Sequence, residues 1–337
     1  MEWLLVGIGL LFLAVSFRLQ KRSRKISARV WQTLCVSATG LLVVLAVALL
    51  VTGGGLFWYT HRPLPSNTYE TLFEGVTYTR DVRHVPRPLV IHVVTVDLSA
   101  PGIGLLVTPG RLTGNRQLPA RTTSQFLLEF DLQIAINGDF FTPWRSNSPW
   151  DYYPHVGDPV DVFGFASSRG AIYSAGMPGH PTLYISPDNQ AQFHAPVGTV
   201  YNAISGNGIF LEQGLAQAAG SAPYYDTPQP RTAIALDGKG RSMLIVVVDG
   251  RQPNYSEGVT LAELAELVAR YGGNTALNLD GGGSTTLVAR GKTGQPVQLN
   301  SPIDNRIPGR ERPVANHLGI YARRPLSLQF PVAGLYF

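Results

Sequence analysis

Two Asp-Gly pairs, each at the end of a short apolar stretch, are the residues of this chain best suited to chemistry. Asp249 follows the apolar, β-branched stretch 242–248, and Asp280 follows the apolar stretch 275–279. Asp280 is itself followed by three glycines and a serine. Consecutive glycines let backbone amides turn inward around an anion, which suits a phosphate or a phosphodiester. Asp-Gly can also simply begin a turn, an alternative that stays open for Asp249 but is weaker for the glycine run, whose backbone entropy costs more.

The elements that must position these aspartates form one strand–helix–strand unit. Both apolar stretches have the length and composition of buried strands. Thr260 and Glu263 form the sequence pattern of a capping box, and apolar residues then recur at helical spacing until Gly272. Because a helix between two strands usually makes those strands parallel, we expect Asp249 and Asp280 at one edge of a sheet.

Similar polar clusters follow other predicted strands and are candidates for the same edge. The amide and backbone candidates for positioning hydroxyl or phosphate oxygens are Asn137, Gly138, Asp139, Asn207, Gly208 and Asn278, together with Gly281, Gly282, Gly283 and Ser284. The guanidinium candidates for pairing with phosphate are Arg231, Arg251, Arg310 and Arg312, of which Arg231 and Arg251 are favoured. The glycine spacing matches neither a P-loop nor a dinucleotide fingerprint.

An unusual segment at 142–165 alternates aromatic residues with prolines and acids. Such a segment suits a long ordered loop near a site, with aromatic faces that stack on sugar rings. A structural cover over the sheet fits the same composition, so both interpretations stay open.

The charge of the chain is unevenly distributed. The net charge of +5 is contributed entirely by residues 1–60, while residues 61–337 contain equal numbers of basic and acidic residues. The basic residues of the first segment are Arg18, Lys21, Arg22, Arg24, Lys25 and Arg29. The composition of the remainder therefore gives no reason to expect nucleic-acid binding.

Two apolar segments, 3–17 and 34–59, flank those basic residues and predict contact with a lipid bilayer. The second is long enough to span, and Trp31, Trp58 and Tyr59 mark its interfaces. The positive-inside rule places the basic loop in the cytoplasm and the residues after 60 outside a bacterial-type inner membrane, in a periplasmic or cell-surface location. A signal peptide is the alternative for segment 3–17, but no small-residue cleavage site follows it.

The predicted organisation is a two-helix membrane hairpin (1–60), a linker (61–69), one domain (70–323) and a tail (324–337). Cys35 is the only cysteine and lies in the second apolar segment, so the domain has no disulfide. Short strands separated by turn residues, with few helices, predict a strand-rich α+β or mixed α/β fold.

The motifs resemble the phosphodiester glycosidase family. The matching stretches are Ala135–Phe141, Asn207–Gly208, Arg231–Ala233, Val248–Arg251, Leu277–Ser284, and Glu311–Arg312 with Val314 and Asn316. They occur in family order across about 92–321. The chain departs from the animal members by lacking their cysteines and by having its apolar segments at the N-terminus.

The resemblance implies hydrolysis of a sugar-1-phosphodiester in an envelope or extracellular glycan. Such cleavage builds positive charge at the anomeric carbon, which a carboxylate stabilises or attacks. Asp280 is the first candidate for that role, Asp249 the second, and Glu311 a candidate acid or base. Asp249 and Asp280, with asparagine oxygens nearby, could alternatively hold Ca²⁺ or Mg²⁺. A non-catalytic module that binds glycan or phosphopolymer, or an exopolysaccharide assembly protein, is the competing class of function.

Overall fold

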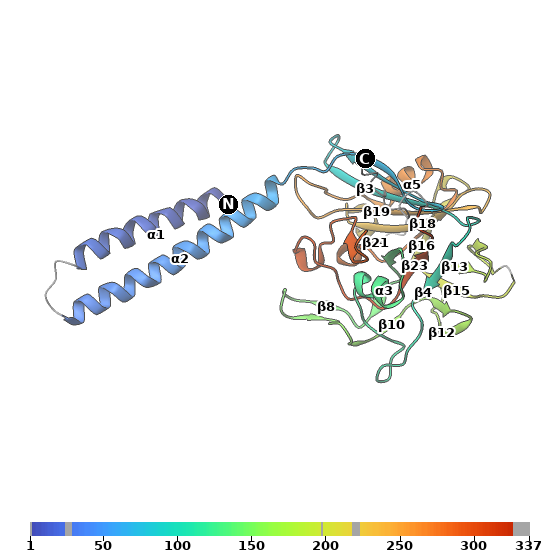
Figure 1. The fold of residues 1–337 in the computed structure, drawn as a ribbon, viewed down its shortest axis with the longest axis horizontal. Helices are drawn as coiled ribbons and strands as arrows, with labels where there is room; N and C mark the ends of the chain where they lie inside the picture. Colours follow the sequence, from blue (N-terminus) through green and yellow to red (C-terminus); the bar gives the residue numbers. More distant parts are fainter. Residues whose placement is uncertain (1, 24–28, 197, 218–222, 326–337) are drawn as a thin grey trace, which may run out of the picture. The chain divides into compact units, whose positions relative to one another are not determined.

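The computed structural model describes residues 2–23, 29–196, 198–217 and 223–325 (Figure 1). The chain divides into two compact units, Met1–Pro63 and Leu64–Phe337, which are described separately below. Part of the predicted basic loop, at 24–28, and most of the predicted tail, at 326–337, lie outside the described residues.

The N-terminal unit is a helical hairpin of α1 (Glu2–Ser23) and α2 (Arg29–His61). Gly9 allows close packing, since a side chain there would lie 3.1 Å from Leu50 Cγ and 3.3 Å from the Ala46 carbonyl oxygen. The Trp3 and Phe57 rings meet edge to face at 5.2 Å. Stretches of both helices, Trp3–Lys21 and Val36–His61, are long and apolar enough to cross a membrane, as either an anchor or a signal sequence would be.

The largest element of the second unit is an eight-stranded antiparallel sheet in the order β1-β2-β3-β19-β18-β20-β16-β17. Its strands are β1 (Thr68–Phe73), β2 (Val76–Arg83), β3 (Leu89–Asp97), β16 (Gly208–Glu212), β17 (Leu215–Ala216), β18 (Arg231–Leu236), β19 (Ser242–Val248) and β20 (Thr275–Asn278).

The strand–helix–strand unit is present as β19, α5 (Leu261–Arg270) and β20. Thr260 and Glu263 form the capping box, and the apolar face of α5 packs on the large sheet. Strands β19 and β20 are parallel to each other, but they are not neighbours. Strand β18 lies between them and pairs antiparallel with both.

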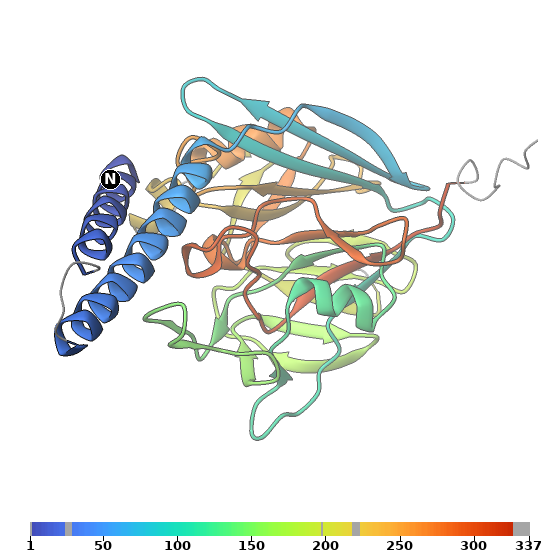
Figure 2. The same cartoon turned by 60° about the vertical axis from the view of Figure 1, so that its left-hand side comes forward.

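A second layer consists of two five-stranded sheets. One has the order β22-β21-β6-β23-β4 and the other β12-β11-β15-β13-β14. Their strands are β4 (Gly104–Val107), β6 (Ile134–Asn137), β11 (Phe165–Ser168), β12 (Ala171–Ala175), β13 (Thr182–Ile185), β14 (Ala191–Gln192), β15 (Asn202–Ser205), β21 (Leu287–Arg290), β22 (Pro296–Gln298) and β23 (His317–Tyr321). Helix α3 (Thr123–Glu129) packs on the sheet that contains β6 (Figure 2).

Smaller elements connect these layers. They are β5 (Leu118–Pro119), β7 (Phe141–Thr142), β8 (Arg145–Ser146), β9 (Tyr152–Tyr153), β10 (Pro159–Val162), α4 (Pro223–Asp226) and the 3₁₀ turns η1 (Gly282–Ser284) and η2 (Asp304–Arg306). Strands β8 and β9 pair as a short hairpin.

The main core lies between the large sheet and the second layer, and a separate core lies between the large sheet and α5. Central strands such as β19 are therefore buried on both faces, which explains their continuous apolar sequences. The domain is a strand-rich α+β fold in which strand ends of the two layers meet at one edge.

Candidate active site

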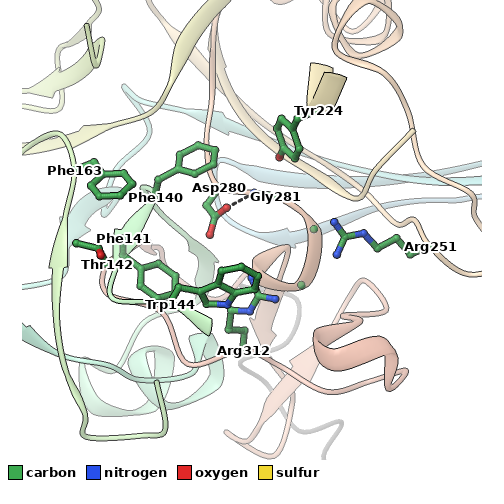
Figure 3. Close-up of a pocket in the computed structure, with 12 residues that line it drawn as sticks. Phe140, Phe141, Thr142, Trp144, Phe163, Tyr224, Arg251, Asp280, Gly281 and Arg312 are labelled. Atoms are coloured by element: carbon green, nitrogen blue, oxygen red, sulfur yellow. Dashed lines mark hydrogen bonds between the residues drawn. The ribbon is translucent and has the colours of Figure 1, made fainter. Parts of the chain in front are cut away.

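A pocket of about 500 Å³ opens where β6, β19 and β20 end (Figure 3). It is lined by Phe140, Phe141, Thr142, Trp144, Phe163, Tyr224, Arg251, Asp280, Gly281, Gly282, Gly283 and Arg312. Of the predicted site residues, the lining therefore includes Asp280, the three glycines, Arg251 and Arg312.

Asp280 presents the one carboxylate among the described lining residues. Its Oδ1 accepts a hydrogen bond from the Gly281 amide at 2.9 Å, and its Oδ2 accepts one from Ser284 Oγ at 2.5 Å. Burial raises the pKa of this carboxyl above its ordinary value, while Arg312 and the two hydrogen bonds act in the opposite direction. A partly desolvated carboxylate held in one orientation suits a nucleophile or a base.

Each glycine after Asp280 makes room for a different pocket side chain. A Cβ on Gly281 would lie 2.7 Å from Tyr224 Oη, and one on Gly282 would lie 2.8 Å from Arg251 Nη2. A Cβ on Gly283 would overlap Nη2 of Arg312 and lie 2.8 Å from its Cζ. Gly282 also has a φ of 61°, which a residue with a side chain adopts at a cost. The glycine run is therefore required by close approach and not only by a turn.

Two guanidinium groups face the pocket. Arg312 donates from Nε to Asp304 Oδ1 at 2.8 Å and from Nη1 to Ser284 Oγ at 3.2 Å, and it lies over the Trp144 ring at 4.9 Å. Arg251 donates from Nε to Gln229 Oε1 at 2.6 Å. Burial, followed by the charge of Arg312, lowers the pKa of Arg251. The mutual repulsion of the two cations favours binding of an anion between them.

Aromatic side chains form much of the remaining lining, here called the aromatic wall. Phe140, Phe141 and Phe163 line the pocket together with Trp144, which is 51% exposed. Figure 3 shows the Asp280 carboxyl between these rings and Arg251. The segment 142–165 thus contributes to the pocket through Trp144 and Phe163, and its hairpin is held to the chain near η2 by Arg310, which stacks on Tyr152 at 4.5 Å.

Two residues of the predicted Asn-Gly-Asp cluster, Asn137 and Gly138, hydrogen-bond to the backbone of Asp280. Asn137 donates from Nδ2 to the Asp280 carbonyl at 2.7 Å, while its Oδ1 accepts from Thr232 Oγ1 at 2.9 Å and the Thr286 amide at 3.1 Å. The Asp280 amide donates to the Gly138 carbonyl at 3.1 Å. Asn137 therefore fixes the backbone of Asp280 and is a positioning residue.

Asp139 is buried beneath the aromatic wall. Its carboxyl oxygens accept hydrogen bonds from the amides of Phe140 and Gly164, both at 2.7 Å. Burial raises the pKa of Asp139 to about 8, and the charge of Asp280 acts in the same direction. Its backbone amide is held by Asn316 Oδ1 at 2.8 Å.

Asp249, the second predicted carboxylate, does not line the pocket. Its Oδ1 accepts hydrogen bonds from Asn300 Nδ2 at 3.0 Å and the Ser301 amide at 2.9 Å, and its Oδ2 contacts His92 Nε2 at 3.2 Å. Side chains alternate between the two faces of β19, so the Asp249 side chain points to the same face as Ile245 and Val247, toward the main core. There Asp249 connects the large sheet to the second layer. The structure thus places Asp249 as a buried linking group.

Glu311 and Arg231 also lie outside the lining. Glu311 accepts hydrogen bonds from Ser124 at the start of α3, including one from its amide at 2.9 Å, and from Gln298 Nε2 at 2.9 Å. Arg231 is fully buried and donates to carbonyl oxygens, among them that of Tyr224 at 2.7 Å. Neither side chain is among those that face the pocket.

Asn207, Gly208 and Asn278 join strand ends instead of lining the pocket. Asn278 donates from Nδ2 to Asn207 Oδ1 at 2.7 Å, and the Asn207 amide donates to the Asn278 carbonyl at 3.1 Å. This pair fastens β16 to β20 just before Asp280.

Tyr224 is a lining residue that lies outside every stretch singled out in the sequence. It lies in α4, a single turn whose sequence carries neither periodicity nor a chemical motif, and only the tertiary structure brings it to Gly281. Trp144 was signalled by the aromatic composition of its segment, although composition could not say which ring faces the site.

The predicted cation ligands do not fit a shared metal site. The described residues contain no group of three or more His, Cys, Asp or Glu side chains placed to hold a metal ion. The Asp249 oxygens are engaged in the core, and two guanidinium groups lie beside Asp280. The donor chemistry of the pocket therefore favours an anion.

The sequence model of the phosphodiester glycosidase family matches residues 130–321, more than half of the chain and every residue that lines the pocket. The chain belongs to the phosphodiester glycosidase family. The chain is also similar to human N-acetylglucosamine-1-phosphodiester alpha-N-acetylglucosaminidase, with 29% identity over 199 residues. That match covers 54% of this chain and 36% of the human protein, so the chain spans about a third of the length of its human relative.

Solved structures share the phosphodiester glycosidase fold at lower identity. The catalytic domain of the zebrafish N-acetylglucosamine-1-phosphodiester alpha-N-acetylglucosaminidase, auto-inhibited by its pro-peptide, matches with a TM-score of 0.53 and 20% identity, covering 78% of this chain and 86% of that one. A hypothetical protein from Synechocystis gives a TM-score of 0.57 and 16% identity, covering 77% of this chain and 64% of that one. A Burkholderia pseudomallei protein described as exported gives 0.53 and 15%, covering 71% and 75%.

Proposed function

We propose that the chain is a hydrolase that cleaves the bond between the anomeric carbon and the phosphate oxygen of a sugar-1-phosphodiester. The observation that carries this proposal is the division of the pocket. Asp280 lies between Arg251 on one side and the phenylalanine rings on the other, and Arg312 lies beside it, stacked on Trp144. A sugar ring stacks on aromatic faces, and a phosphodiester pairs with guanidinium groups, so their junction would lie at the carboxylate.

The chemistry follows from this placement. As the anomeric C–O bond breaks, its electron pair moves to the phosphate oxygen and positive charge develops on the sugar. Asp280 faces the positive charge, while Arg251 and Arg312 face the departing negative charge. Water supplies the hydroxyl group that ends on the sugar, and the remaining proton of water goes to the phosphomonoester product or to solvent. The names of the human and zebrafish relatives make N-acetylglucosamine the first sugar to test.

The proposed location is outside the cytoplasm, at a bacterial-type inner membrane. The two apolar helices would anchor the chain, with the basic residues between them on the cytoplasmic side. The substrate would then be an envelope or extracellular glycan that contains glycosyl–phosphate bonds. The structural neighbour described as exported is consistent with this location.

The test uses the full chain in detergent micelles and a panel of sugar-1-phosphodiesters, with release of free sugar measured. Asp280→Asn should lower kcat by about 10²–10⁴-fold, because the group that acts at the anomeric carbon is removed. Asp188→Asn, in an exposed turn, is the matched control. Circular dichroism and thermal unfolding should show that both variants are folded.

Two outcomes would favour the competing classes. A wild-type chain that releases no sugar from any substrate, with and without Ca²⁺ and Mg²⁺, would be a glycan-binding module. A chain that loses its cellular function when residues 1–63 are replaced by an unrelated anchor, while keeping full hydrolytic activity, would be an exopolysaccharide assembly protein.

A further inference from the structure

The Tyr224 hydroxyl lies in the pocket with no acceptor for its hydrogen among the residues that the structure describes. Its Oη is buried and makes no hydrogen bond of good geometry there, and the neighbouring Arg231 guanidinium can only donate to it. Figure 3 shows the hydroxyl end of Tyr224 directed toward Gly281 and Asp280. Buried hydroxyl groups are nearly always hydrogen-bonded, so an orphaned one at a binding site indicates that a ligand supplies the acceptor.

The surrounding structure holds this hydroxyl in place. Arg231 lies under the Tyr224 ring, with its Cζ 4.4 Å from the ring centroid. Arg231 donates from Nη2 to the carbonyl oxygens of Tyr224 at 2.7 Å and Thr227 at 3.2 Å, and from Nε to that of Val259 at 3.1 Å. One guanidinium group thus fixes both ends of α4 against the large sheet.

The charge of Arg231 is also significant. The side chain is fully buried, and its partners in the described part of the chain are carbonyl oxygens, which leave its positive charge uncompensated. A buried cation behind an aromatic ring attracts negative charge to the region in front of it. In front of Tyr224 lies the pocket, where Arg251 and Arg312 face the same volume.

Gly281 completes the arrangement. Any side chain there would lie 2.7 Å from Tyr224 Oη and 2.8 Å from the Pro230 carbonyl oxygen. The absence of a side chain lets the hydroxyl approach the loop that holds Asp280, and therefore the point where the anomeric C–O bond would break.

We infer that Tyr224 is a catalytic residue that donates a hydrogen bond to a phosphate oxygen of the substrate, and that Arg231 is the positioning residue for Tyr224. The inference rests on the proposed function. No proton is transferred from Tyr224, because burial raises the pKa of Tyr224 and the departing phosphomonoester is weakly basic. The hydrogen bond strengthens as negative charge grows on the departing phosphate, so it accelerates the reaction.

The first test compares Tyr224→Phe with Tyr225→Phe. The Tyr225 hydroxyl is outside the pocket lining and accepts a hydrogen bond from Asn207 Nδ2 at 3.4 Å. Tyr224→Phe should lower kcat on a sugar-1-phosphodiester by about 10- to 100-fold with little change in KM, at an unchanged Tm. Tyr225→Phe should keep wild-type kinetics. Wild-type kcat/KM in Tyr224→Phe would overturn the inference.

The second test isolates Arg231 by a double-mutant cycle. Arg231→Lys should lower kcat in the wild-type background but cause no further loss in Tyr224→Phe, since its effect passes through the tyrosine. Equal losses in both backgrounds would show that Arg231 does not act through Tyr224.

Failure of the proposed function gives a different result. If the wild type hydrolyses no sugar-1-phosphodiester, that function is wrong, and calorimetric titration with inorganic phosphate still tests the hydrogen bond. Tyr224→Phe should then bind phosphate about tenfold more weakly than the wild type. Equal affinities would remove Tyr224 from the binding site.

Discussion

Replacing Gly283 by alanine tests whether the glycine loop holds Arg312 in its working position. The new Cβ would overlap Nη2 of Arg312, lie 2.8 Å from its Cζ and lie 3.0 Å from Asp304 Oδ1. The guanidinium must move, and it gives up the 2.8 Å bond to Asp304 and the 3.2 Å bond to Ser284. Gly283 has no positive φ, so crowding and not backbone strain causes the effect.

The structure allows the two losses to be estimated separately. The side chains of Arg312 and Asp304 are 11% and 2% exposed, so their bond is weakly screened by solvent. Losing a charge-assisted hydrogen bond of this kind costs about 1.5–3 kcal/mol of unfolding free energy. Displacing one oriented cation from a departing phosphate costs about 10²–10³-fold in kcat. Since most of the chain stays folded at such a stability loss, the fall in activity must come from the site.

The assay measures kcat/KM on a sugar-1-phosphodiester alongside the denaturant midpoint. Gly238→Ala is the control, because the three atoms nearest to its Cβ would all belong to Asn274, the nearest at an ordinary 3.5 Å. We expect wild-type activity for the control and the combined losses for Gly283→Ala. Wild-type activity in Gly283→Ala would show that Arg312 need not occupy its observed position.

Three further predictions concern charges around the pocket. Arg312→Gln should move the acidic limb of the pH profile of kcat/KM to higher pH, because Arg312 lowers the pKa of Asp280. If the limb does not move, the ionisation that it reports is not that of Asp280. Stability should fall as pH rises from about 4 toward 8, because the pKa of folded Asp139 is raised to about 8 and the folded chain retains a proton that the unfolded chain releases. Urea midpoints measured across this pH range should show a smaller decline in Asp139→Asn. An unchanged decline in that variant would contradict the prediction. Glu311→Gln should keep kcat within a few-fold while lowering Tm, because Glu311 accepts a hydrogen bond from the Ser124 amide in the first turn of α3. A folded but inactive variant would support the original prediction that Glu311 is an acid or base.

Local signals in the sequence were sufficient for the strand–helix–strand unit. The capping box at Thr260, the helical spacing after it and the two apolar strands are all determined by near neighbours. The prediction that β19 and β20 end at one edge of the sheet requires only that the two strands run parallel. The insertion of β18 between them could not be read from the sequence, because β18 precedes the unit along the chain and its pairing is decided by the whole sheet.

The site was predictable where backbone geometry determined it. The glycine run after Asp280 indicated close approach, and the structure places three pocket side chains against it. Asp249 presented the same local pattern, but its partners His92 and Asn300 are remote in sequence and draw it into the core. Tyr224 carried no local signal, since its importance comes from Arg231 behind it and Gly281 in front.

The pocket lies where strand ends of the two layers meet, and this position determines when during synthesis its lining can be complete. Asn137 and Asp280 are joined directly, yet they are separated by 143 positions, and the lining extends onward to Arg312. A growing chain that has not yet delivered Arg312 has the aromatic wall and the carboxylate but lacks one of the two cations. The lining of the pocket is therefore complete only after residue 312 has been synthesised.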